Sequence, residues 1–333
     1  MEKQLQALSQ LRLFLEELLE NNMEEVANSC LLENKWFTSD SISNSVKGIL
    51  NYLDPESLDQ WINKENITIT QDPRKIGIIM AGNIPAVGFH DLLCSYITGN
   101  ITKVKLSSQD QYLMHLIINK ITEFNPDSPI EIVEKVNDIE AVIATGSNNS
   151  ARYFSYYFSK YPHIIRKNRN SAALIYNSIT DIELEHLSHD IFSYFGLGCR
   201  SVSKLYIEKG FDLPRLDVMT KPYSSIIHHN KYINNYEYQR SLLLINKVPH
   251  LDFGNLMIRE NTDFATPVSV VNYEFFDNNE QLTSELKGKS ELIQCIVGPE
   301  DNSISTVKYG KSQSPELWDY ADNINTIEFI KSL

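Results

Sequence analysis

The sequence lacks the short motifs that assign a function at once. It contains no G-x-G-x-x-G loop, no G-x-x-x-x-G-K-S/T loop, no C-x-x-C pair and no Cys/His spacing typical of zinc sites. No uninterrupted apolar run is long enough to span a bilayer, and no internal repeat is present. These absences count against P-loop hydrolases, structural zinc proteins, membrane-spanning proteins and repeat proteins, and no metal is expected.

Positive charge is in deficit, with 30 Lys and Arg against 43 Asp and Glu and a formal net charge of -13. Such a surface repels phosphate backbones, so nucleic acid is not an expected partner. A site for a phosphorylated cofactor remains compatible with this charge, because it needs only a few N–H groups and one or two cations. The four cysteines lie far apart and are expected to be reduced thiols, which indicates a cytoplasmic protein.

A length of 333 residues suits about two domains. Residues 1–50 are expected to form a helical N-terminal segment with a break at the Ser-rich stretch 39–45. From Lys75 onward short β-runs alternate with helical stretches, which predicts βαβ units and parallel sheets. We therefore expect an α/β fold with a cofactor-binding domain at 51–170, a catalytic domain at 171–310 and a C-terminal segment at 311–333.

The individual elements follow from hydrophobic periodicity and turn residues. Strands are expected in the runs KIGII, ITKVKL, AVIATG, SAALIY, VSKLYIE, NLMIRE, PVSVVNY and ELIQCIVG. Helices are expected from Pro85, at about 109–124, 148–159 and 232–247, and in a segment that ends at FGLGC.

Cys199 is the first residue that points to chemistry. It lies in FGLGCRS, at a junction between a predicted helix and a predicted strand, where small neighbours leave room for a substrate carbonyl. A nucleophilic cysteine needs access and a positive environment that lowers the thiol pKa, and Arg200 or a helix end could supply it. Cys30, Cys94 and Cys295 lie in apolar runs and fit the commoner role of small buried side chains.

Asn83 is the second such residue, in the loop that follows the predicted strand KIGII. Its side-chain amide is able to donate a hydrogen bond to a developing oxyanion. On its own, an Asn at this position is more often a helix cap or turn residue. The presence of Cys199 favours the functional interpretation.

Four motifs in this order resemble the aldehyde dehydrogenase superfamily: GNIPA at 82–86, GNITKVKLSS at 99–108, ATGSNNSAR at 144–152 and GLGCRS at 196–201. Within it, the GCRS context and the helical N-terminus look like the acyl-CoA reductases of the LuxC family. The resemblance covers about residues 75–298. It implies an aldehyde-dehydrogenase-like fold, with a Rossmann-type cofactor domain and an α/β catalytic domain that carries the nucleophilic cysteine.

The resemblance also implies roles for residues. Cys199 would be the nucleophile and Asn83 the oxyanion donor. Lys105 matches the lysine at the adenosine ribose, and Gly146 with Ser147 matches the turn at the pyrophosphate. Ser108 stands where relatives selective for NAD often carry a glutamate, so NADPH is the expected cofactor, with NADH as the alternative. Taken alone, Lys105 is more often a solvated charge and Ser147 a plain N-cap.

One departure from the superfamily concerns the hydrolytic base. The E-L-G-G segment of ordinary aldehyde dehydrogenases corresponds here to IIRKNRNSAAL, where Arg166, Lys167 and Arg169 stand in place of a carboxylate. An acyl-enzyme without a base should persist until hydride arrives, which favours reduction. For a second family glutamate only Glu260 or Asp263 is available near FATPVSV.

The sequence therefore predicts a reductase that converts a long-chain acyl-CoA or other acyl thioester to the aldehyde through acyl-Cys199. Two alternatives stay open: an acyl-phosphate reductase of the glutamyl-phosphate type, and a non-catalytic relative that binds an acyl carrier or synthetase. An acyl-protein synthetase, an acyl carrier and a homo-oligomer remain open as partners. The histidines, including His90, His186 and His189, are expected to have structural or surface roles.

Overall fold

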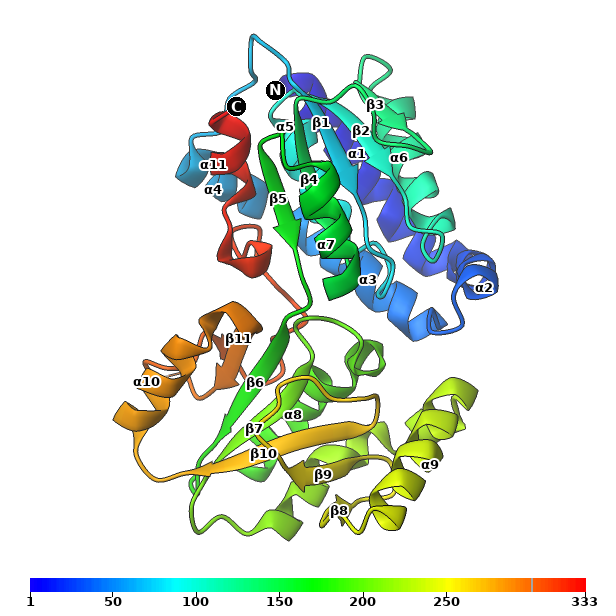
Figure 1. Ribbon diagram of the computed structural model, residues 1–333. Coiled ribbons are helices and arrows are strands. Elements are labelled where there is room, and N and C mark those ends of the chain that lie inside the picture. Colours follow the sequence, from blue (N-terminus) through cyan, green and yellow to red (C-terminus); the bar gives the residue numbers. More distant parts are fainter. Residues whose placement is uncertain (301) are drawn as a thin grey trace. The chain divides into compact units, whose positions relative to one another are not determined.

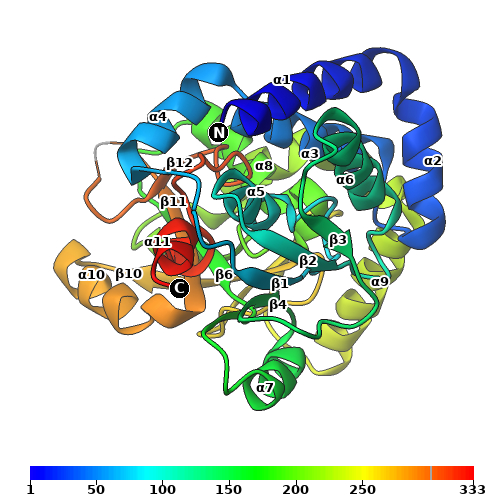
Figure 2. The same ribbon diagram turned by 90° about the horizontal axis from the view of Figure 1, so that it is seen from above.

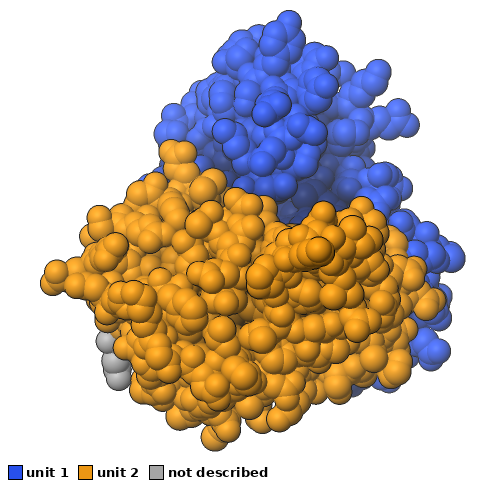
Figure 3. Space-filling model, turned by 60° about the horizontal axis from the view of Figure 1, so that its bottom comes forward, with its two compact units in different colours: residues 1–168, 315–333 blue, residues 169–314 orange. Residues whose placement is uncertain are grey.

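The structure is a computed structural model that describes residues 1–300 and 302–333. The chain divides into two compact units, drawn in different colours in Figure 3. Unit 1 comprises residues 1–168 and 315–333, and unit 2 comprises residues 169–314. The sequence suggested divisions after residues 50, 170 and 310. The N-terminal helices and residues 315–333 both belong to unit 1.

Unit 1 contains a parallel sheet with the strand order β3-β2-β1-β4-β5 (Figure 1). Its strands are short and rich in β-branched residues, as parallel strands buried by helices usually are. They are β1 (Lys75–Ile79), β2 (Ile101–Lys105), β3 (Ile130–Ile132), β4 (Ala141–Thr145) and β5 (His163–Arg166). The sequence predicted β1, β2 and β4, whereas β5 lies in a stretch that was considered only for its charges.

Helices cover both faces of this sheet. Figure 2 shows α1, α5 and α6 on one side of β1, β2 and β4, and α7 on the other. The helical elements of unit 1 are α1 (Glu2–Glu17), the π-helical turn η1 (Leu18–Asn22), α2 (Met23–Glu33), α3 (Ser39–Tyr52), α4 (Pro55–Glu65), α5 (Phe89–Ile97), α6 (Tyr112–Phe124), α7 (Asn148–Tyr157), the 3₁₀ turn η5 (Ala321–Asn323) and α11 (Thr326–Lys331).

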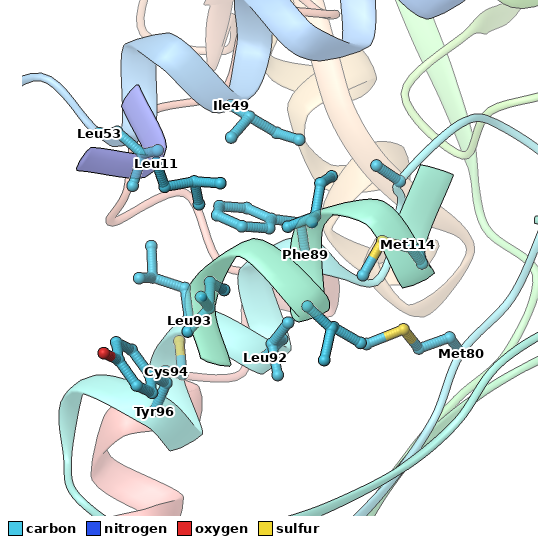
Figure 4. Packing of buried hydrophobic residues seen from close by; sticks show 14 of the residues in the cluster. Leu11, Ile49, Leu53, Met80, Phe89, Leu92, Leu93, Cys94, Tyr96 and Met114 are labelled. Carbon is cyan, nitrogen blue, oxygen red and sulfur yellow. The ribbon is translucent and has the colours of Figure 1, made fainter. Parts of the chain in front are cut away.

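The main core of unit 1 joins the N-terminal helices to the sheet. Phe89 of α5 lies close to Leu11 of α1 and Ile49 of α3, and all three are buried (Figure 4). The alternation of side chains along β4 places Ile143 in this core and Val142 in a second cluster beneath α7. The helices at residues 1–52 are thus part of the folded body of unit 1.

The expected break at the Ser-rich stretch 39–45 is wrong. Helix α3 begins at Ser39, and the Oγ1 of Thr38 caps it by accepting a hydrogen bond from the backbone N–H of Ser41 at 3.2 Å. Serine is favoured near helix N-termini, and Ser41 and Ser45 are buried within the helix. The break between the helices lies just before Thr38, at residues 34–37.

Unit 2 contains a second sheet with the order β12-β11-β6-β7-β10-β9-β8, in which β8 and β9 pair antiparallel and the other neighbours pair parallel. Its strands are β6 (Asn170–Ile175), β7 (Val202–Glu208), β8 (Leu251–Asp252), β9 (Met257–Glu260), β10 (Val270–Phe276), β11 (Ile293–Gly298) and β12 (Val307–Lys308). Its helices are α8 (Asp181–Phe192), α9 (Asn230–Ile245) and α10 (Asn279–Gly288), with 3₁₀ segments η2 (Ser193–Gly196), η3 (Leu213–His228) and η4 (Ser290–Leu292). The expected α/β class with parallel sheets is confirmed.

In the central strand β7, the position of the strand in the sheet decides which side chains are buried, and the alternating sequence pattern does not. Its alternating sequence VSKLYIE suggested one polar face, yet every residue from Val202 to Ile207 is buried, because β7 runs between β6 and β10. The ammonium of Lys204 has no exposed surface and is neutralised by Glu274 of β10 at 2.6 Å. A buried charge of this kind needs such a partner.

Candidate functional site

The carboxyl ends of β1, β2 and β4 gather the predicted cofactor residues and the predicted oxyanion donor at one edge of the unit 1 sheet. Ile79 at the end of β1 pairs with Lys105 on one side and with Ala144 on the other. The loops that begin at these positions carry Asn83, Lys105 with Ser108, and Gly146 with Ser147. In open α/β sheets, ligands bind outside the carboxyl ends of the strands, where the strand order reverses. In the order 3-2-1-4-5 that point lies between β1 and β4.

Side chains from distant helices hold the backbone of the Asn83 loop. The Nδ2 of Asn34 donates to the carbonyl of Gly82 at 3.1 Å, and the Oγ of Ser45 donates to the carbonyl of Pro85 at 2.7 Å. The side chain of Asn83 is exposed between these two attachment points. The loop therefore presents an amide to its surroundings from a fixed backbone.

The same loop contains a strained residue. Ala86 has a φ of 51°, in the left-handed region that non-glycine residues seldom adopt. Its backbone N–H donates to the Oδ2 of Asp110 at 2.7 Å, and Asp110 is 2% exposed. Burial raises the pKa of Asp110 to about 7, an effect that the N–H of Ala86 opposes.

The expected helix start at Pro85 is wrong, because residues 85–88 form a turn and α5 begins at Phe89. Proline suits the first helical turn, but here the left-handed Ala86 interrupts it. Gly88, which ends the turn, packs so closely on Met80 that an added Cβ would lie 2.5 Å from the Cγ of Met80. The turn adds an irregular stretch between β1 and α5, and this stretch carries Asn83.

Lys105 and Ser108 are both exposed. The Nζ of Lys105 donates to the backbone carbonyl of Glu134 at 2.9 Å, which fixes the lysine across the end of β3. Ser108 lies in the turn between β2 and α6, two residues before Asp110. A cation and a hydroxyl are thus available at the expected ribose position.

Gly146 and Ser147 form the turn from β4 into α7. The Oγ of Ser147 accepts a hydrogen bond from the N–H of Ser150 at 3.2 Å, so this side chain is the N-cap of α7. An added Cβ at Gly146 would lie 2.8 Å from the Cβ of Ser150, which explains the glycine. The turn leaves the positive end of the α7 dipole at the carboxyl edge of the sheet.

Cys199 lies in a tight turn in unit 2. The N–H of Ser201 donates to the carbonyl of Gly198 at 3.0 Å, and the N–H of Gly198 donates to the Oγ of Ser201 at 3.3 Å. Cys199 and Arg200 are the two central residues of this turn. Cys199 is partly exposed.

The residues directly before this turn are not helical, although the sequence suggested a helix that ends at FGLGC. Helix α8 ends at Phe192, and Tyr194, Phe195 and Gly196 follow with φ of 52°, 58° and 75°. Three successive left-handed residues cannot continue a right-handed helix. Phe195 packs on His229 with ring centroids 4.4 Å apart, which anchors the strained segment within unit 2.

Arg200 is fixed by contacts of its own. Its Nε donates to the carbonyl of Ser312. The N–H groups of Ser312 and Gly310 donate to the carboxylate of Asp190 at 2.8 and 2.6 Å. The segment that follows β12 is therefore tied to α8 and supports the guanidinium next to Cys199.

The other cysteines are all buried. Burial raises the pKa of Cys30 to about 12 and raises the pKa of Cys94 well above its usual value. These two thiols are protonated at neutral pH and inert as nucleophiles. Exposure distinguishes Cys199 from the three others, as the sequence suggested.

The basic stretch that we expect in place of the E-L-G-G segment has its three charged side chains in different environments. Arg166 is 3% exposed, pairs with Asp91 and donates to the Oγ1 of Thr326 at 2.9 Å. Lys167 is exposed. Arg169 donates to the carbonyls of Ser290 and Ile293.

The histidines show structural contacts. The Nε2 of His90 lies 2.9 Å from the carbonyl of Leu317, and burial lowers the pKa of the ring. His186 and His189 are exposed on α8, and the Nδ1 of His189 bonds the hydroxyl of Tyr223. Among residues 1–300 and 302–333 no cluster of His, Cys, Asp and Glu is arranged to hold a metal ion. No helix in the described part of the chain is long and apolar enough to cross a membrane.

Sequence reasoning did not find the residues that support the two loops. Asn34, Ser45 and Asp110 hold the Asn83 loop from 24 to 48 positions away. Ser171 donates its hydroxyl proton to the carbonyl of Cys199 at 3.0 Å, from 28 positions away. The sequence feature that could have indicated these supports is the presence of small polar residues within apolar segments, such as Ser45 and Ser171.

Solved structures define the class of fold. An aldehyde dehydrogenase from Physcomitrella patens, solved with succinate, matches 99% of this chain and 83% of its own at a TM-score of 0.66 and 10% identity. An aldehyde dehydrogenase from Bacillus cereus, solved with NAD⁺, matches 90% of this chain and 72% of its own at a TM-score of 0.64 and 15% identity. The chain has the aldehyde-dehydrogenase fold, with a Rossmann-type unit and a catalytic-type α/β unit, as expected.

Sequence comparison narrows this class. The family described as acyl-CoA reductase (LuxC) matches residues 5–219, and the chain belongs to this family. A long-chain acyl-protein thioester reductase from Aliivibrio fischeri is 24% identical over 168 residues, which cover 45% of this chain and 35% of that protein. The match spans about a third of the length of this relative.

Proposed function

We propose that the protein is a nicotinamide-dependent reductase that converts a long-chain acyl-CoA or another acyl thioester to the aldehyde through a covalent acyl-Cys199 intermediate. Membership of the acyl-CoA reductase family and the aldehyde-dehydrogenase fold support this reaction class. The observation that carries the proposal is the setting of Cys199, a partly exposed thiol at the centre of a tight turn, in a chain whose other thiols are buried.

In the proposed reaction the Cys199 thiolate attacks the thioester carbonyl, and the side-chain amide of Asn83 with the backbone N–H of Cys199 donates to the oxyanion. Collapse expels the thiol of the acyl donor and leaves the acyl group on Cys199. A nicotinamide cofactor, for which Lys105, Ser108 and the turn at Gly146 and Ser147 are the proposed binding residues, would supply a hydride to this carbonyl. The hemithioacetal on Cys199 then breaks its C–S bond, which releases the aldehyde and restores the thiolate.

The carboxyl edge of the unit 1 sheet fits a dinucleotide. Lys105 and Ser108 would contact the adenosine ribose and its 2′-phosphate, and the first turn of α7 after Gly146 and Ser147 would face the pyrophosphate. The Oγ of Ser147 caps α7, so backbone N–H groups would provide the pyrophosphate contacts. We propose NADPH as the preferred cofactor, because no carboxylate stands at position 108.

The acyl donor is proposed from the relatives. The relative from Aliivibrio fischeri is named as a reductase of acyl-protein thioesters. This name supports a protein-bound acyl group as a second donor in addition to acyl-CoA. An acyl-protein synthetase or an acyl carrier would supply that group. An acyl-phosphate reductase would use the same cysteine with a different leaving group. Turnover of an acyl-CoA and of an acyl phosphate of equal chain length separates the two.

The test is mass spectrometry after incubation with palmitoyl-CoA in the absence of nicotinamide. Wild-type protein should gain one acyl mass on the peptide that contains Cys199, and Cys199→Ala should gain none. Cys30→Ala, which removes a buried thiol, is the matched control and should be acylated like the wild type. Acylation of Cys199→Ala, or an unmodified Cys199 after incubation with every thioester in a chain-length series, would contradict the proposal.

A further inference from the structure

Ser171 is a buried hydroxyl that joins the Cys199 turn to the interior of the unit 2 sheet. It is the second residue of β6, and it has no exposed surface. Its Oγ donates to the carbonyl of Cys199 at 3.0 Å, lies 3.1 Å from the Sγ of Cys295 and accepts from the N–H of Cys295 at 3.3 Å. One hydroxyl therefore contacts both cysteines of unit 2.

The directions of these bonds follow from the groups involved. A serine hydroxyl has one proton to donate and two lone pairs to accept with. The carbonyl of Cys199 only accepts, so the proton of Ser171 goes to it. The thiol of Cys295 must then donate to the Oγ, as its backbone N–H does. Every hydrogen-bonding position of the hydroxyl is used, which fixes its orientation.

The sheet departs from regular pairing on both sides of Ser171. Between β6 and β7 the register shifts between Ser171 and Ala172, which pair with Val202 and Lys204. Between β6 and β11 the register shifts between Ile293 and Ile296, which pair with Asn170 and Ala172. Irregularities of this kind redirect side chains and are common beside active sites. Here both flank the residue that contacts Cys199.

The contact acts on a carbonyl that the turn's own hydrogen bond does not use. The carbonyl of Gly198 accepts from the N–H of Ser201, whereas that of Cys199, at the second turn position, accepts from the hydroxyl of Ser171. The N–H of Ser171 also donates to the carbonyl of Ser201 at 3.4 Å. Ser171 therefore binds the turn at two places, through its side chain at Cys199 and through its backbone at Ser201.

We infer that Ser171 is a positioning residue that sets the orientation of the Cys199 peptide, and hence of the thiol, for attack on the substrate. The expected effect on the acylation rate rests on the proposed function, whereas the expected effect on the mobility of the Cys199 turn does not. Loss of the hydroxyl leaves the carbonyl of Cys199 without this donor, and the peptide that carries the nucleophile gains freedom to rotate. Small displacements of a nucleophile lower reaction rates much more than substrate binding.

The experiment compares Ser171→Ala with two controls. Ser188→Ala removes a hydroxyl that is equally buried in unit 2 but bonds the carbonyl of Glu185 within its own helix. Cys295→Ala removes the thiol donor and leaves the bond between Ser171 and Cys199. For each variant, pre-steady-state acylation by palmitoyl-CoA gives a maximal rate and a half-saturating concentration, and hydrogen–deuterium exchange follows the segment 198–203. Circular dichroism reports the thermal melt.

Ser171→Ala should lower the maximal acylation rate about tenfold or more, the factor expected for one lost hydrogen bond, with a half-saturating concentration within about threefold of wild type. Exchange in segment 198–203 should rise about tenfold. Both controls should stay within about threefold of wild type in each measurement. Equal effects in Ser171→Ala and Cys295→Ala, unchanged exchange in Ser171→Ala, or loss of its cooperative melt would overturn the assignment. If acyl-CoA fails to acylate the wild type, the proposed function fails, and the exchange measurement still decides the role of Ser171.

Discussion

The carboxylate of Asp110 accepts a hydrogen bond from the backbone N–H of Ala86 at 2.7 Å, and this bond supports a left-handed residue three positions after Asn83. Asp110 is almost completely buried, and its pKa lies near 7. A carboxyl group that is partly protonated at neutral pH therefore contacts the loop that carries the proposed oxyanion donor.

This pKa predicts how stability depends on pH. Between about pH 4 and pH 7 the folded protein holds a proton on Asp110 that the unfolded chain releases, so the contribution of Asp110 to stability falls as pH rises through this range. Asp110→Asn, which resembles the protonated form, should remove the decline. Each pKa unit corresponds to about 1.4 kcal/mol. The difference in the free energy of unfolding between Asp110→Asn and wild type should therefore change by about a few kcal/mol from pH 4.5 to pH 8.

Urea unfolding followed by tryptophan fluorescence measures this effect in the right unit, because Trp36, Trp61 and Trp318 all lie in unit 1. Asp59→Asn on the exposed side of α4 is the control and should keep the wild-type dependence. An Asp110→Asn variant whose stability falls with pH as steeply as that of wild type would show that Asp110 does not titrate in this range.

Asn83→Ala should lower kcat by about 10² to 10³, the usual loss for one oxyanion donor, and change cofactor binding much less. The backbone attachments of the loop through Asn34 and Ser45 do not involve the Asn83 side chain, so the fold of unit 1 should be retained. Steady-state kinetics and cofactor titration by fluorescence measure the two quantities. A kcat equal to that of wild type would make Asn83 a turn residue only.

The ion pair between Arg166 and Asp91 predicts a stability effect in the stretch that we expect in place of the hydrolytic glutamate. Both side chains are buried in unit 1. Removing Arg166 leaves a buried carboxylate without its cation, a change that typically costs about 3–5 kcal/mol. Arg166→Met should therefore destabilise unit 1 strongly in urea unfolding, and Lys167→Met, at the exposed neighbouring position, should have little effect. Equal midpoints for the two variants would contradict a structural role for Arg166.

These residues show what sequence allows and where it stops. The strands that begin at Lys75, Ala141 and Val202 were predictable, because short apolar runs between turn residues are typical of parallel strands. The partial exposure of Cys199 was predictable from its glycine-rich context. The supports from Asp110 and Ser171 were not, because a hydrogen bond between residues 24 or 28 positions apart leaves no periodic pattern. The charge of Arg166 was visible, but its partner Asp91, 75 positions away, was not.

Cofactor choice is predicted to depend on position 108. A carboxylate there would bind the ribose diol and repel a 2′-phosphate, whereas the exposed Ser108 does neither. Wild type should have the higher kcat/KM with NADPH, and Ser108→Glu should reduce the NADPH to NADH ratio by about tenfold or more. Gln109→Glu adds the same charge one residue later and should change the ratio much less. A wild-type preference for NADH would refute the assignment.

The acyl-enzyme is predicted to hydrolyse slowly, because the stretch that we expect in place of the hydrolytic glutamate offers no base. Arg166 is bound to Asp91, Lys167 is exposed and Arg169 donates to two carbonyls of unit 2. Protein loaded with palmitoyl-CoA and freed of excess substrate should therefore keep its acyl group, and later addition of NADPH should release the aldehyde.

Parallel assays of palmitic acid and palmitaldehyde from the loaded protein measure this partition, and aldehyde should exceed acid at least about tenfold when NADPH is present. Release of acid as fast as aldehyde would mean that another carboxylate activates water. Glu260 and Asp263 are then the residues to test, since they lie at the end of β9 and just beyond it. Acid release that falls in Glu260→Gln or Asp263→Asn would make the protein a hydrolytic aldehyde dehydrogenase.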